Sequence, residues 1–491
     1  MSSLRALAIA VCALAATAGP AAAAPAGTIG TSPKLFPKFS PRVTDYVARC
    51  QAGSPLALAV HAPQRAKVRI DGGQATHGSR LVRLRLAGGQ GVTVRIARGK
   101  TAATYHVRCI GRGFPHWTAE RHGTPQAEWY IVTPSGGGPK NTGTHFVAIF
   151  DRNGVPVWWL KEPFSNPNDA KLLPDGNLVW SDFTFTPYVT RAAPYREHRF
   201  DGTQVRSIAA IGGVETDSHD LQVLPNGDYL LEAYVPRDGV DLSPYGGPKN
   251  ATVVDAEVQE VSPSGQLVWS WSSKDHIALS ESGPWMGQII PQPRAMPDGR
   301  LVFDIVHING IEPDGGSLLL SFRHTNSIYK ISRATGEIEW KLGGTHTPQS
   351  LTVTGEPEDS LLFSGEHDPR LMPDGTLTVH DNRTLSDLGP RAVRFRVDEA
   401  ARTATQIEQV TDPEAPHALC CGSAQKLPRG NWVMDWGYSP LITELTPSGK
   451  RVFGLHLGGE LYSYRAVPVV PRRLSARKLR AGMDAMYPRS R

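Results

Sequence analysis

Three histidines occupy the same position relative to a recurring turn, and this spacing suggests a shared site. The turn has the sequence Pro-x-Gly and occurs with its proline at Pro174, Pro225, Pro313, Pro373 and Pro428. The residues six positions before these prolines are, in the same order, Asn168, His219, His307, His367 and Gly422. Histidine makes up only 16 of the 491 residues, so this enrichment is not expected from composition. Equivalent positions of a repeat lie at equivalent places in a fold, so we expect these side chains to converge.

Converging imidazoles can serve two kinds of chemistry. Three histidines with an open fourth position are a pattern of catalytic zinc sites. An imidazole can instead act as a nucleophile or a general base near neutral pH. Asn309 follows His307 by two residues, and Arg323 and His324 lie one predicted strand further on. A guanidinium is costly beside a metal dication but binds sulfate or phosphate through two hydrogen bonds, so the neighbours favour an anion site without a metal.

The segments that carry these residues repeat from about residue 117 onward. Apolar strands that end in Pro-x-Gly alternate with a second turn, in which a glycine precedes an aromatic residue by four positions, as in Gly154 and Trp158. Tandem units of about four strands in roughly 40–60 residues indicate a β-propeller, whose innermost strands surround a central channel. We therefore expect an all-β fold with a six-bladed propeller over residues 117–466. The blades are expected near residues 117–163, 168–213, 219–273, 291–344, 367–410 and 422–458.

The first of these units lacks its own Pro-x-Gly turn. Its strand EWYIVTP is therefore expected to pair with the C-terminal segment and close the ring. Composition agrees with such a fold, because 49 Gly and 40 Pro exclude a coiled coil or a helical bundle. A hydrophobic content of 40% also argues against global disorder.

Residues 31–113 are expected to form a separate β-sandwich of the immunoglobulin-like type. Short segments of alternating hydrophobicity are parted there by Gly and Pro turns at near-regular spacing. Cys50 and Cys109 lie near the two ends of this domain, and we expect a disulfide that joins its first strand to its last. Cys420 and Cys421 are adjacent, so they form either a strained vicinal disulfide or two free thiols.

The two ends of the chain suggest export and a solvated tail. Residues 1–24 contain Arg5, a short apolar run and small residues, which is the pattern of a signal peptide. We therefore expect a periplasmic or extracellular protein with no inserted membrane helix, since no later apolar run is long enough. Residues 467–491 contain the basic string PRRLSARKLR and are expected to be a solvated tail. The net charge of +6 comes without a dense Lys/Arg stripe, so a nucleic-acid partner is not expected.

The propeller region resembles bacterial arylsulfotransferases, which use phenolic sulfate esters rather than nucleotide sulfate donors. The similarity runs from about residue 117 to residue 466 and includes a tail motif, ELYSYRA. The other segments that carry it are SHDLQVLPNGDYLL, DIVHINGIEPDGGSLLLSFRHTNSIYKI, TGEIEWKLGG and GEHDPRLMPDGTLTVHDN. The resemblance implies an enzyme without a cofactor that exchanges a sulfuryl group between a small phenolic sulfate donor and a phenolic acceptor.

The resemblance also implies a role for each residue of the predicted ring. His367 corresponds to the nucleophile that carries the sulfuryl group as a sulfohistidine in a ping-pong mechanism. His219, His307 and Arg323 are expected to be catalytic, and Asn309 and His324 to bind substrate. Together these groups would hold the sulfuryl oxygens or handle the phenolic proton.

The chain departs from the family pattern at three places. Members of the family carry a spaced cysteine pair near the mouth of the site, whereas Cys420 and Cys421 are adjacent. Gly310 stands where relatives often have serine, so a polar contact is expected to be missing there. Gly422 and Ser423 occupy the last ring position, which leaves the polar contribution of that position open.

Three other interpretations remain from the sequence. Quinoprotein dehydrogenases also carry glycine-plus-tryptophan turns, but they usually have eight blades and acidic or amide ligands for a metal-bound quinone, which are not evident here. A secreted propeller could also bind glycans or peptides without catalysis. Finally, each histidine could simply cap a strand at the channel mouth and bind water.

Overall fold

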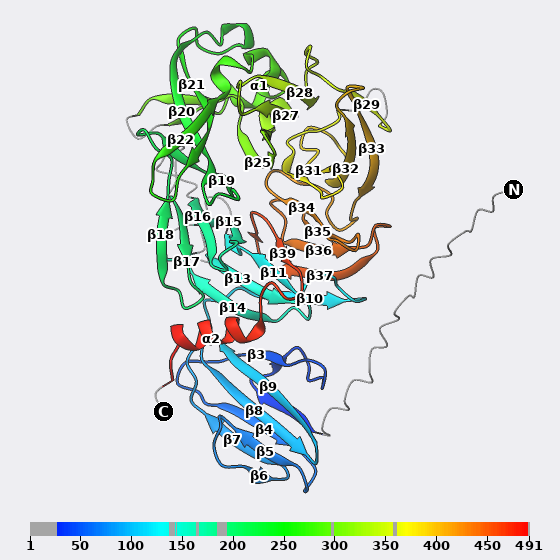
Figure 1. Ribbon diagram of the computed structural model, residues 1–491. Coiled ribbons are helices and arrows are strands. Elements are labelled where there is room, and N and C mark those ends of the chain that lie inside the picture. The colour runs from blue at the N-terminus through cyan, green and yellow to red at the C-terminus, as the bar shows by residue number, and fades with distance from the viewer. Residues whose placement is uncertain are drawn as a thin grey trace, which may run out of the picture.

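The computed structural model describes residues 27–136, 143, 145–163, 166–183, 194–295, 299–356 and 361–489. The predicted signal peptide, residues 1–24, lies outside the described residues. Figure 1 shows a small β-sheet domain, a larger ring of sheets and a C-terminal helix between them. The predicted all-β, propeller-type fold is confirmed, since nearly all the regular structure is strand. Among the described residues, no helix has both the length and the apolar character needed to span a membrane.

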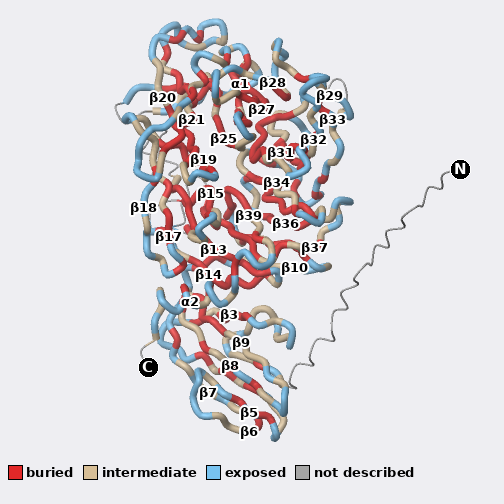
Figure 2. Tube along the Cα trace, viewed as in Figure 1, coloured by how far each residue is buried: buried red, intermediate tan, exposed pale blue. Residues whose placement is uncertain are grey.

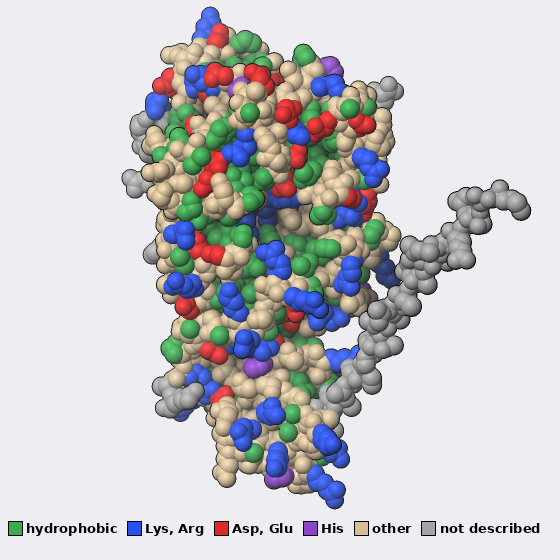
Figure 3. Space-filling model, in the orientation of Figure 1, with side chains coloured by type: hydrophobic (Ala, Val, Ile, Leu, Met, Phe, Trp, Pro, Cys, Tyr) green, Lys and Arg blue, Asp and Glu red, His purple; other side chains and the backbone are tan. Residues whose placement is uncertain are grey.

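The N-terminal domain packs two sheets around a buried core. Its smaller sheet has the order β1 (Thr28–Ser32), β4 (Leu56–His61), β7 (Arg80–Leu84). Its larger sheet has the order β2 (Leu35–Phe36), β3 (Asp45–Arg49), β9 (Thr101–Ile110), β8 (Gly91–Arg98), β5 (Lys67–Ile70), β6 (Thr76–His77). Alternate residues of β8 point inward, and Val94 and Ile96 are fully buried in the core between the sheets. On the face shown in Figure 3, the charged side chains of this domain are mainly Lys and Arg.

The predicted disulfide between Cys50 and Cys109 is confirmed. It links the end of β3 to β9, and these two strands pair in parallel. The bridge does not join the first strand to the last, because β1 and β2 both precede Cys50 in the chain.

Six sheets in the described part of the chain make up the larger body. From the channel outward, the first sheet has the order β39 (Val467–Val469), β11 (Trp129–Val132), β13 (Phe146–Asp151), β14 (Pro156–Lys161). The second has the order β15 (Asn166–Leu172), β16 (Leu178–Phe183), β17 (Tyr195–His198), β18 (Gln204–Ile208). The third begins with β19 (Glu215–Val223), β20 (Tyr229–Val240) and β21 (Ala251–Val261); both β22 (Leu267–Ser272) and β24 (Leu301–Asp304) pair with β21, and β23 (Arg294–Ala295) pairs with β24.

The other three sheets continue around the ring. They are β25 (Ile308–Asp314), β26 (Ser317–Phe322), β27 (Ser327–Ser332), β28 (Ile338–Gly343); β30 (His367–Leu371), β31 (Thr376–Asp381), β32 (Arg391–Asp398), β33 (Thr403–Val410), β29 (Thr352–Thr354); and β34 (Ser423–Lys426), β35 (Trp432–Asp435), β36 (Leu441–Leu445), β37 (Arg451–Leu457), β10 (Trp117–Arg121). A short pair, β12 (Ser135–Gly136) and β38 (Leu461–Tyr462), lies outside these sheets.

The innermost strands contact one another in order from β15 to β39, and β11, which pairs with β39, contacts β15 and so closes the ring. Figure 2 shows that the buried residues concentrate there. The strand EWYIVTP becomes β11 and pairs with the C-terminal strand β39, so the predicted closure by the C-terminal segment is confirmed. The last strand of the chain, β39, is therefore the innermost strand of the first sheet, whose other strands begin near residue 129.

Two predicted blade boundaries are wrong. The strand at residues 117–121 does not belong to the first blade, because it pairs with β37 at the outer edge of the last sheet. Residues 294–304 do not begin the fourth blade, because β24 pairs in parallel with β21 of the third. In both cases a strand joins the sheet that offers a free edge rather than the sheet nearest in sequence.

The C-terminal residues are not a solvated tail. After β39, Ser475 caps the helix α2 (Ala476–Met486) by accepting a hydrogen bond from the backbone of Lys478. Leu479 and Met483 are buried against the propeller. Next to this buried face, Arg480 pairs with Asp45 of the sandwich at 2.6 Å. The second half of the basic string therefore begins an amphipathic helix that contacts both domains.

The other helices are short and lie between strands of the propeller. They are α1 (Gly283–Ile289) and the 3-10 turns η1 (Ser243–Tyr245), η2 (Ser273–Asp275), η3 (Leu279–Ser282) and η4 (Arg323–Thr325). Two of these, α1 and η4, contact each other at one side of the channel mouth.

Four of the innermost strands are irregular where the predicted ring residues stand. The register of pairing shifts in β15, β19, β25 and β30 at or beside the residue six positions before the Pro-x-Gly proline. Such bulges turn a side chain away from its regular direction. His307 even takes a left-handed backbone conformation, with φ of 53°. The repeat therefore builds a bulge into successive blades at the level of the ring.

The disulfide predicts a measurable contribution to stability. It closes a loop of 59 residues, which should constrain the unfolded chain by about 4 kcal/mol. Cys50→Ser should lower the free energy of unfolding of the sandwich by about that amount, which denaturant titration would show as a lower midpoint. Cys420→Ser breaks no disulfide and should leave the midpoint nearly unchanged. Equal midpoints for wild type and Cys50→Ser would contradict the stabilising role.

Candidate functional site

The three ring histidines line one cavity at a mouth of the channel. The cavity has a volume of about 710 Å³, and His219, His307 and His367 contribute to its wall. Arg323 and His324, from η4, line the same cavity. The structure therefore brings together five of the six residues to which the sequence analysis gave a chemical role. Their roles stay predictions, because placement alone does not test them.

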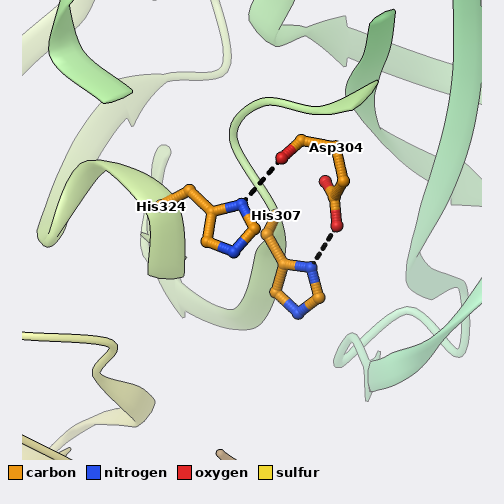
Figure 4. Close-up of side chains that lie close together, drawn as sticks. All are labelled: Asp304, His307 and His324. Carbon is orange, nitrogen blue, oxygen red and sulfur yellow. Dashed lines mark hydrogen bonds and ion pairs between the residues drawn. The ribbon is translucent and has the colours of Figure 1, made fainter. Parts of the chain in front are cut away.

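Each of the four imidazoles in this cavity is anchored through Nδ1. The Nδ1 of His219 contacts Asp217 Oδ1, and the Nδ1 of His307 lies 2.5 Å from Asp304 Oδ2. The Nδ1 of His324 lies 2.7 Å from the carbonyl oxygen of Asp304. These partners can only accept, so each Nδ1 carries a hydrogen and the lone pair of each neutral ring is on Nε2. Figure 4 shows Asp304 holding both His307 and His324 in this way.

His367 has the most enclosed imidazole of the ring. Its Nδ1 lies 2.9 Å from the carbonyl oxygen of Gly365 and 2.8 Å from Oδ1 of Asn382. Its Nε2 accepts a hydrogen bond of 3.1 Å from the backbone N–H of Cys421. Burial, followed by the nearby charge of Arg323, holds the pKa of His367 well below its usual range. The ring is therefore neutral at pH 7, with the lone pair of Nε2 directed at a backbone donor.

The histidines form a compact row with a guanidinium beside it. The ring centres of His219 and His307 are 4.8 Å apart, and those of His307 and His324 are 4.9 Å apart. Arg323 donates from one terminal nitrogen to Nε2 of His324 at 2.9 Å and from the other to the carbonyl oxygen of Leu419 at 2.9 Å. Its guanidinium lies 4.2 Å from the ring centre of Trp285, which fixes its plane.

Asn309 is placed differently from the other predicted residues. It is fully buried, and its amide nitrogen donates to the carbonyl oxygen of Glu366 at 2.7 Å. This contact ties β25 to the residue just before His367. The structure therefore gives Asn309 a contact that supports the position of His367, and its predicted contact with substrate stays a prediction.

Aromatic and apolar side chains from several blades form much of the remaining wall. Tyr234 comes from the third sheet, Trp285 from α1, and Tyr462 and Tyr464 from the segment that precedes β39. The indole nitrogen of Trp285 donates to Oδ1 of Asn326 at 2.7 Å, so the orientation of this ring is fixed. Such walls suit a planar aromatic substrate whose charged end reaches the histidines and Arg323.

Cys420 and Cys421 are two free thiols in the structure, not a vicinal disulfide. Their sulfur atoms are 2.7 Å apart, and both residues line the cavity. The contact between the sulfurs lowers the pKa of the Cys420 thiol and raises that of the Cys421 thiol. The two thiols lie close to His367, because the backbone N–H of Cys421 donates to its imidazole.

The other two departures from the family pattern have simple steric causes. A Cβ on Gly310 would lie 2.5 Å from Cδ of Pro369, so there is no room here for the serine expected from relatives. A Cβ on Gly422 would lie 2.5 Å from Nε2 of His380, and its φ is 99°. The hydroxyl of Ser423 donates to the carbonyl oxygen of Ala466 at 3.2 Å and so holds the closing segment. The last ring position therefore supports the fold.

A layer of buried charges that was not predicted from the sequence lies next to the ring. Arg465 donates to Oδ1 of Asp169 at 2.8 Å and to the carbonyl oxygen of Asn309 at 2.8 Å. Arg370 pairs with Asp220 at 3.0 Å and with Asp368 at 2.8 Å. The three aspartates each follow a ring position directly in the sequence, as in Asn-Asp and His-Asp, and this repeated signal could have identified them.

The partners of the histidines were missed as well. Asp217 and Asp304 stand two and three residues before the histidines that they contact. An acidic residue that close to a ring histidine was a usable signal. Asn382, in contrast, comes from the turn after β31, and nothing in its local sequence pointed to His367.

Two groups of side chains have the composition of a metal site. They are Asp304 with His307 and His324, and Asp217 with His219 and Glu232. In the first group the Nδ1 hydrogens already point at the oxygens of Asp304, and Nε2 of His324 accepts from the Arg323 guanidinium. A dication there would have to displace these hydrogens and tolerate a fixed cation beside it, so this group does not fit a metal.

Solved structures with a related fold are only distantly similar. A protein of unknown function from Bacteroides caccae has a TM-score of 0.42 and 15% identity, covering 70% of this chain and 99% of that one. TolB from Acinetobacter baumannii has a TM-score of 0.40 and 13% identity, covering 78% and 81%. Virginiamycin B lyase from Staphylococcus aureus has a TM-score of 0.34 and 10% identity, covering 74% and 90%. None of these similarities bears on the chemistry.

Sequence comparison gives a specific result at the family level. Among curated proteins, none matches the chain significantly. The profile of the family described as Arylsulfotransferase (ASST) matches residues 210–458. This match spans slightly more than half of the chain and contains His219, His307, Arg323 and His367. The chain therefore belongs to the arylsulfotransferase family.

Proposed function

We propose that this protein transfers a sulfuryl group from a phenolic sulfate ester to a phenolic acceptor through a sulfohistidine at His367. The observation that carries this proposal is the neutral, anchored imidazole of His367 in the same cavity as the Arg323 guanidinium. A nucleophile that has no proton to lose, beside a fixed cation, suits attack on an anionic sulfate ester.

In the first half-reaction, Nε2 of His367 attacks the sulfur of the donor. The N–S bond forms from the lone pair of Nε2, and the S–O bond to the phenol breaks with its electron pair on the phenolic oxygen. In the free protein the backbone N–H of Cys421 donates to this lone pair, so it must turn from Nε2 to a sulfuryl oxygen as the donor binds. There it joins Arg323 in stabilising the charge that spreads over the sulfuryl oxygens. A neighbouring imidazolium returns a proton to the leaving phenolate.

In the second half-reaction, an acceptor phenol takes the place of the first. Its proton passes to Nε2 of the neighbouring imidazole while its oxygen attacks the sulfur. The N–S electron pair returns to Nε2 of His367, so the enzyme regains both its nucleophile and its protonated imidazole. The Nδ1 contacts of His367 with Gly365 and Asn382 keep the ring in one orientation throughout.

The shape of the cavity supports a sequential use of one site by two phenols. Its aromatic walls suit either the donor or the acceptor ring, and one set of groups serves both half-reactions.

The proposal also includes export of the protein to the periplasm or the cell exterior. The pattern of residues 1–24 supports export, and so does the disulfide between Cys50 and Cys109.

The first test is turnover with p-nitrophenyl sulfate as donor and a simple phenol as acceptor. Rates measured at several acceptor levels should give parallel double-reciprocal lines, since donor and acceptor bind to different enzyme forms. His367→Ala should reduce turnover to near background, and Arg323→Ala should lose about 100- to 1000-fold in kcat. His122→Ala, which alters an exposed histidine of the outer surface, is the matched control and should be fully active.

Two results would count against this assignment. Absence of turnover with a range of aryl sulfates and phenols would favour a non-catalytic binding protein. A His367→Ala variant that keeps more activity than His307→Ala would leave the cavity as the site but place the nucleophile elsewhere.

Transfer should not depend on a metal ion. The Arg323 guanidinium and the engaged Nδ1 hydrogens leave the cavity suited to an anion. Dialysis against a strong chelator should therefore leave the rate unchanged. Loss of activity that is restored by one divalent metal would instead assign the histidines to a metal centre.

A further inference from the structure

We infer that Asp304 is the positioning residue of the proton-transfer step. In this assignment its carboxylate holds His307 as the group that exchanges a proton with the phenol, and its carbonyl aligns Arg323 through His324. The inference rests on the proposed function, because it assigns a role within that reaction.

Asp304 reaches the site from a different sheet than the histidines it contacts. It ends β24, which belongs to the third sheet, whereas His307 leads into β25 and His324 lies in η4 of the fourth. Its carboxylate meets Nδ1 of His307 at 2.5 Å, and its carbonyl oxygen meets Nδ1 of His324 at 2.7 Å. Figure 4 shows the two rings side by side, each held at the nitrogen nearer to Asp304.

The backbone around these two histidines is locked as well. The backbone N–H of Arg323 donates to the carbonyl oxygen of His307 at 2.9 Å, and that of His324 donates to Val306 at 3.0 Å. His307 is held in its left-handed conformation by this local pairing. The imidazole of His307 therefore has little freedom to find another partner if Asp304 changes.

The electrostatics favour a carboxylate that stays ionised. Burial would raise the pKa of Asp304, but the charge and hydrogen bond of His307, together with His324, hold it well below its usual range. Burial lowers the pKa of His307, and Asp304 opposes that effect. The carboxylate therefore stabilises the imidazolium that forms when His307 takes the phenolic proton and that keeps this proton until the next donor binds.

The second function of Asp304 works through its backbone. Because the carbonyl oxygen can only accept, His324 must carry its hydrogen on Nδ1 and leave Nε2 as an acceptor. Nε2 of His324 then accepts from Arg323 at 2.9 Å, which directs the guanidinium across the face of Trp285. A change to the side chain of Asp304 leaves this carbonyl in place, so the two functions can be tested separately.

The proton balances over a full turnover. The acceptor phenol loses its proton to Nε2 of His307 as its oxygen bonds to sulfur. In the next turnover the same proton passes from His307 to the oxygen of the leaving phenol as the S–O bond breaks. His219, held by Asp217, is the competing candidate for this role, and it supplies a matched comparison.

The test uses a series of aryl sulfates whose leaving phenols range from acidic to weakly acidic. An acidic phenol such as p-nitrophenol leaves with little help, whereas unsubstituted phenol needs a proton. Asp304→Asn should therefore lose only a few-fold in kcat/KM with p-nitrophenyl sulfate but about 100-fold with phenyl sulfate. The first donor serves as an internal control, because a misfolded variant would lose activity with both.

Two further variants separate the alternatives. His324→Leu should lose activity to the same extent with every donor, because it disturbs only the alignment of Arg323. Asp217→Asn should also show no extra loss with weakly acidic leaving phenols. This pattern, with a leaving-group effect confined to Asp304→Asn, would support the inference.

The contradicting outcomes are distinct. If Asp304→Asn loses activity equally with all donors, or if the leaving-group effect appears in Asp217→Asn instead, the inference is wrong while the proposed function stands. If the wild-type protein transfers sulfuryl groups from none of the donors, the proposed function fails and the inference fails with it.

Discussion

One buried guanidinium joins the innermost strands of three blades beside the residues that build the site. The side chain of Arg465 is 1% exposed and lies 2.8 Å from Asp169 and 3.2 Å from Asp220. It also donates to the carbonyl oxygen of Asn309, so it touches three successive blades. Removing one partner of such a buried network typically costs about 3–5 kcal/mol, because the remaining charges stay buried. We expect the geometry of the ring to depend on these contacts, since each partner lies one or two residues after a ring position.

The bulges next to this layer place equivalent residues of several blades together, but the side chains there have different partners. The same irregularity in neighbouring blades presents Asn168, His219, His307 and His367 at one level, but each histidine has a different anchor. His219 and His307 have carboxylates at Nδ1, whereas His367 has a carbonyl and an amide oxygen. A neutral anchor suits a nucleophile that must stay unprotonated, and a carboxylate suits a group that must take up a proton. These anchors agree with the proposed division of roles.

The sequence predicted most of what repeats along the chain, although the aspartates that follow three of the ring positions were overlooked. The position of His219, His307 and His367 follows from the Pro-x-Gly register, and the ring closure follows from the unit that lacks this turn. The short sequence distance between Asp304 and His307 was a usable signal, but the sheet to which Asp304 belongs was not predictable, because β24 joins the third sheet across an insertion. Residues 467–491 were misjudged because their many basic side chains suggested a solvated segment, although Leu479 and Met483 of α2 form an apolar face.

The claim that His367 carries the sulfuryl group is tested most directly by trapping the intermediate. Wild-type protein should be mixed with donor and no acceptor, quenched under conditions that preserve N-sulfonated histidine, digested and analysed by mass spectrometry. The account predicts one sulfuryl group per chain, on the peptide that contains His367, and its loss when a phenol is added before the quench. A label on the peptide containing His219 or His307, or transfer to phenol without any labelled peptide, would contradict it.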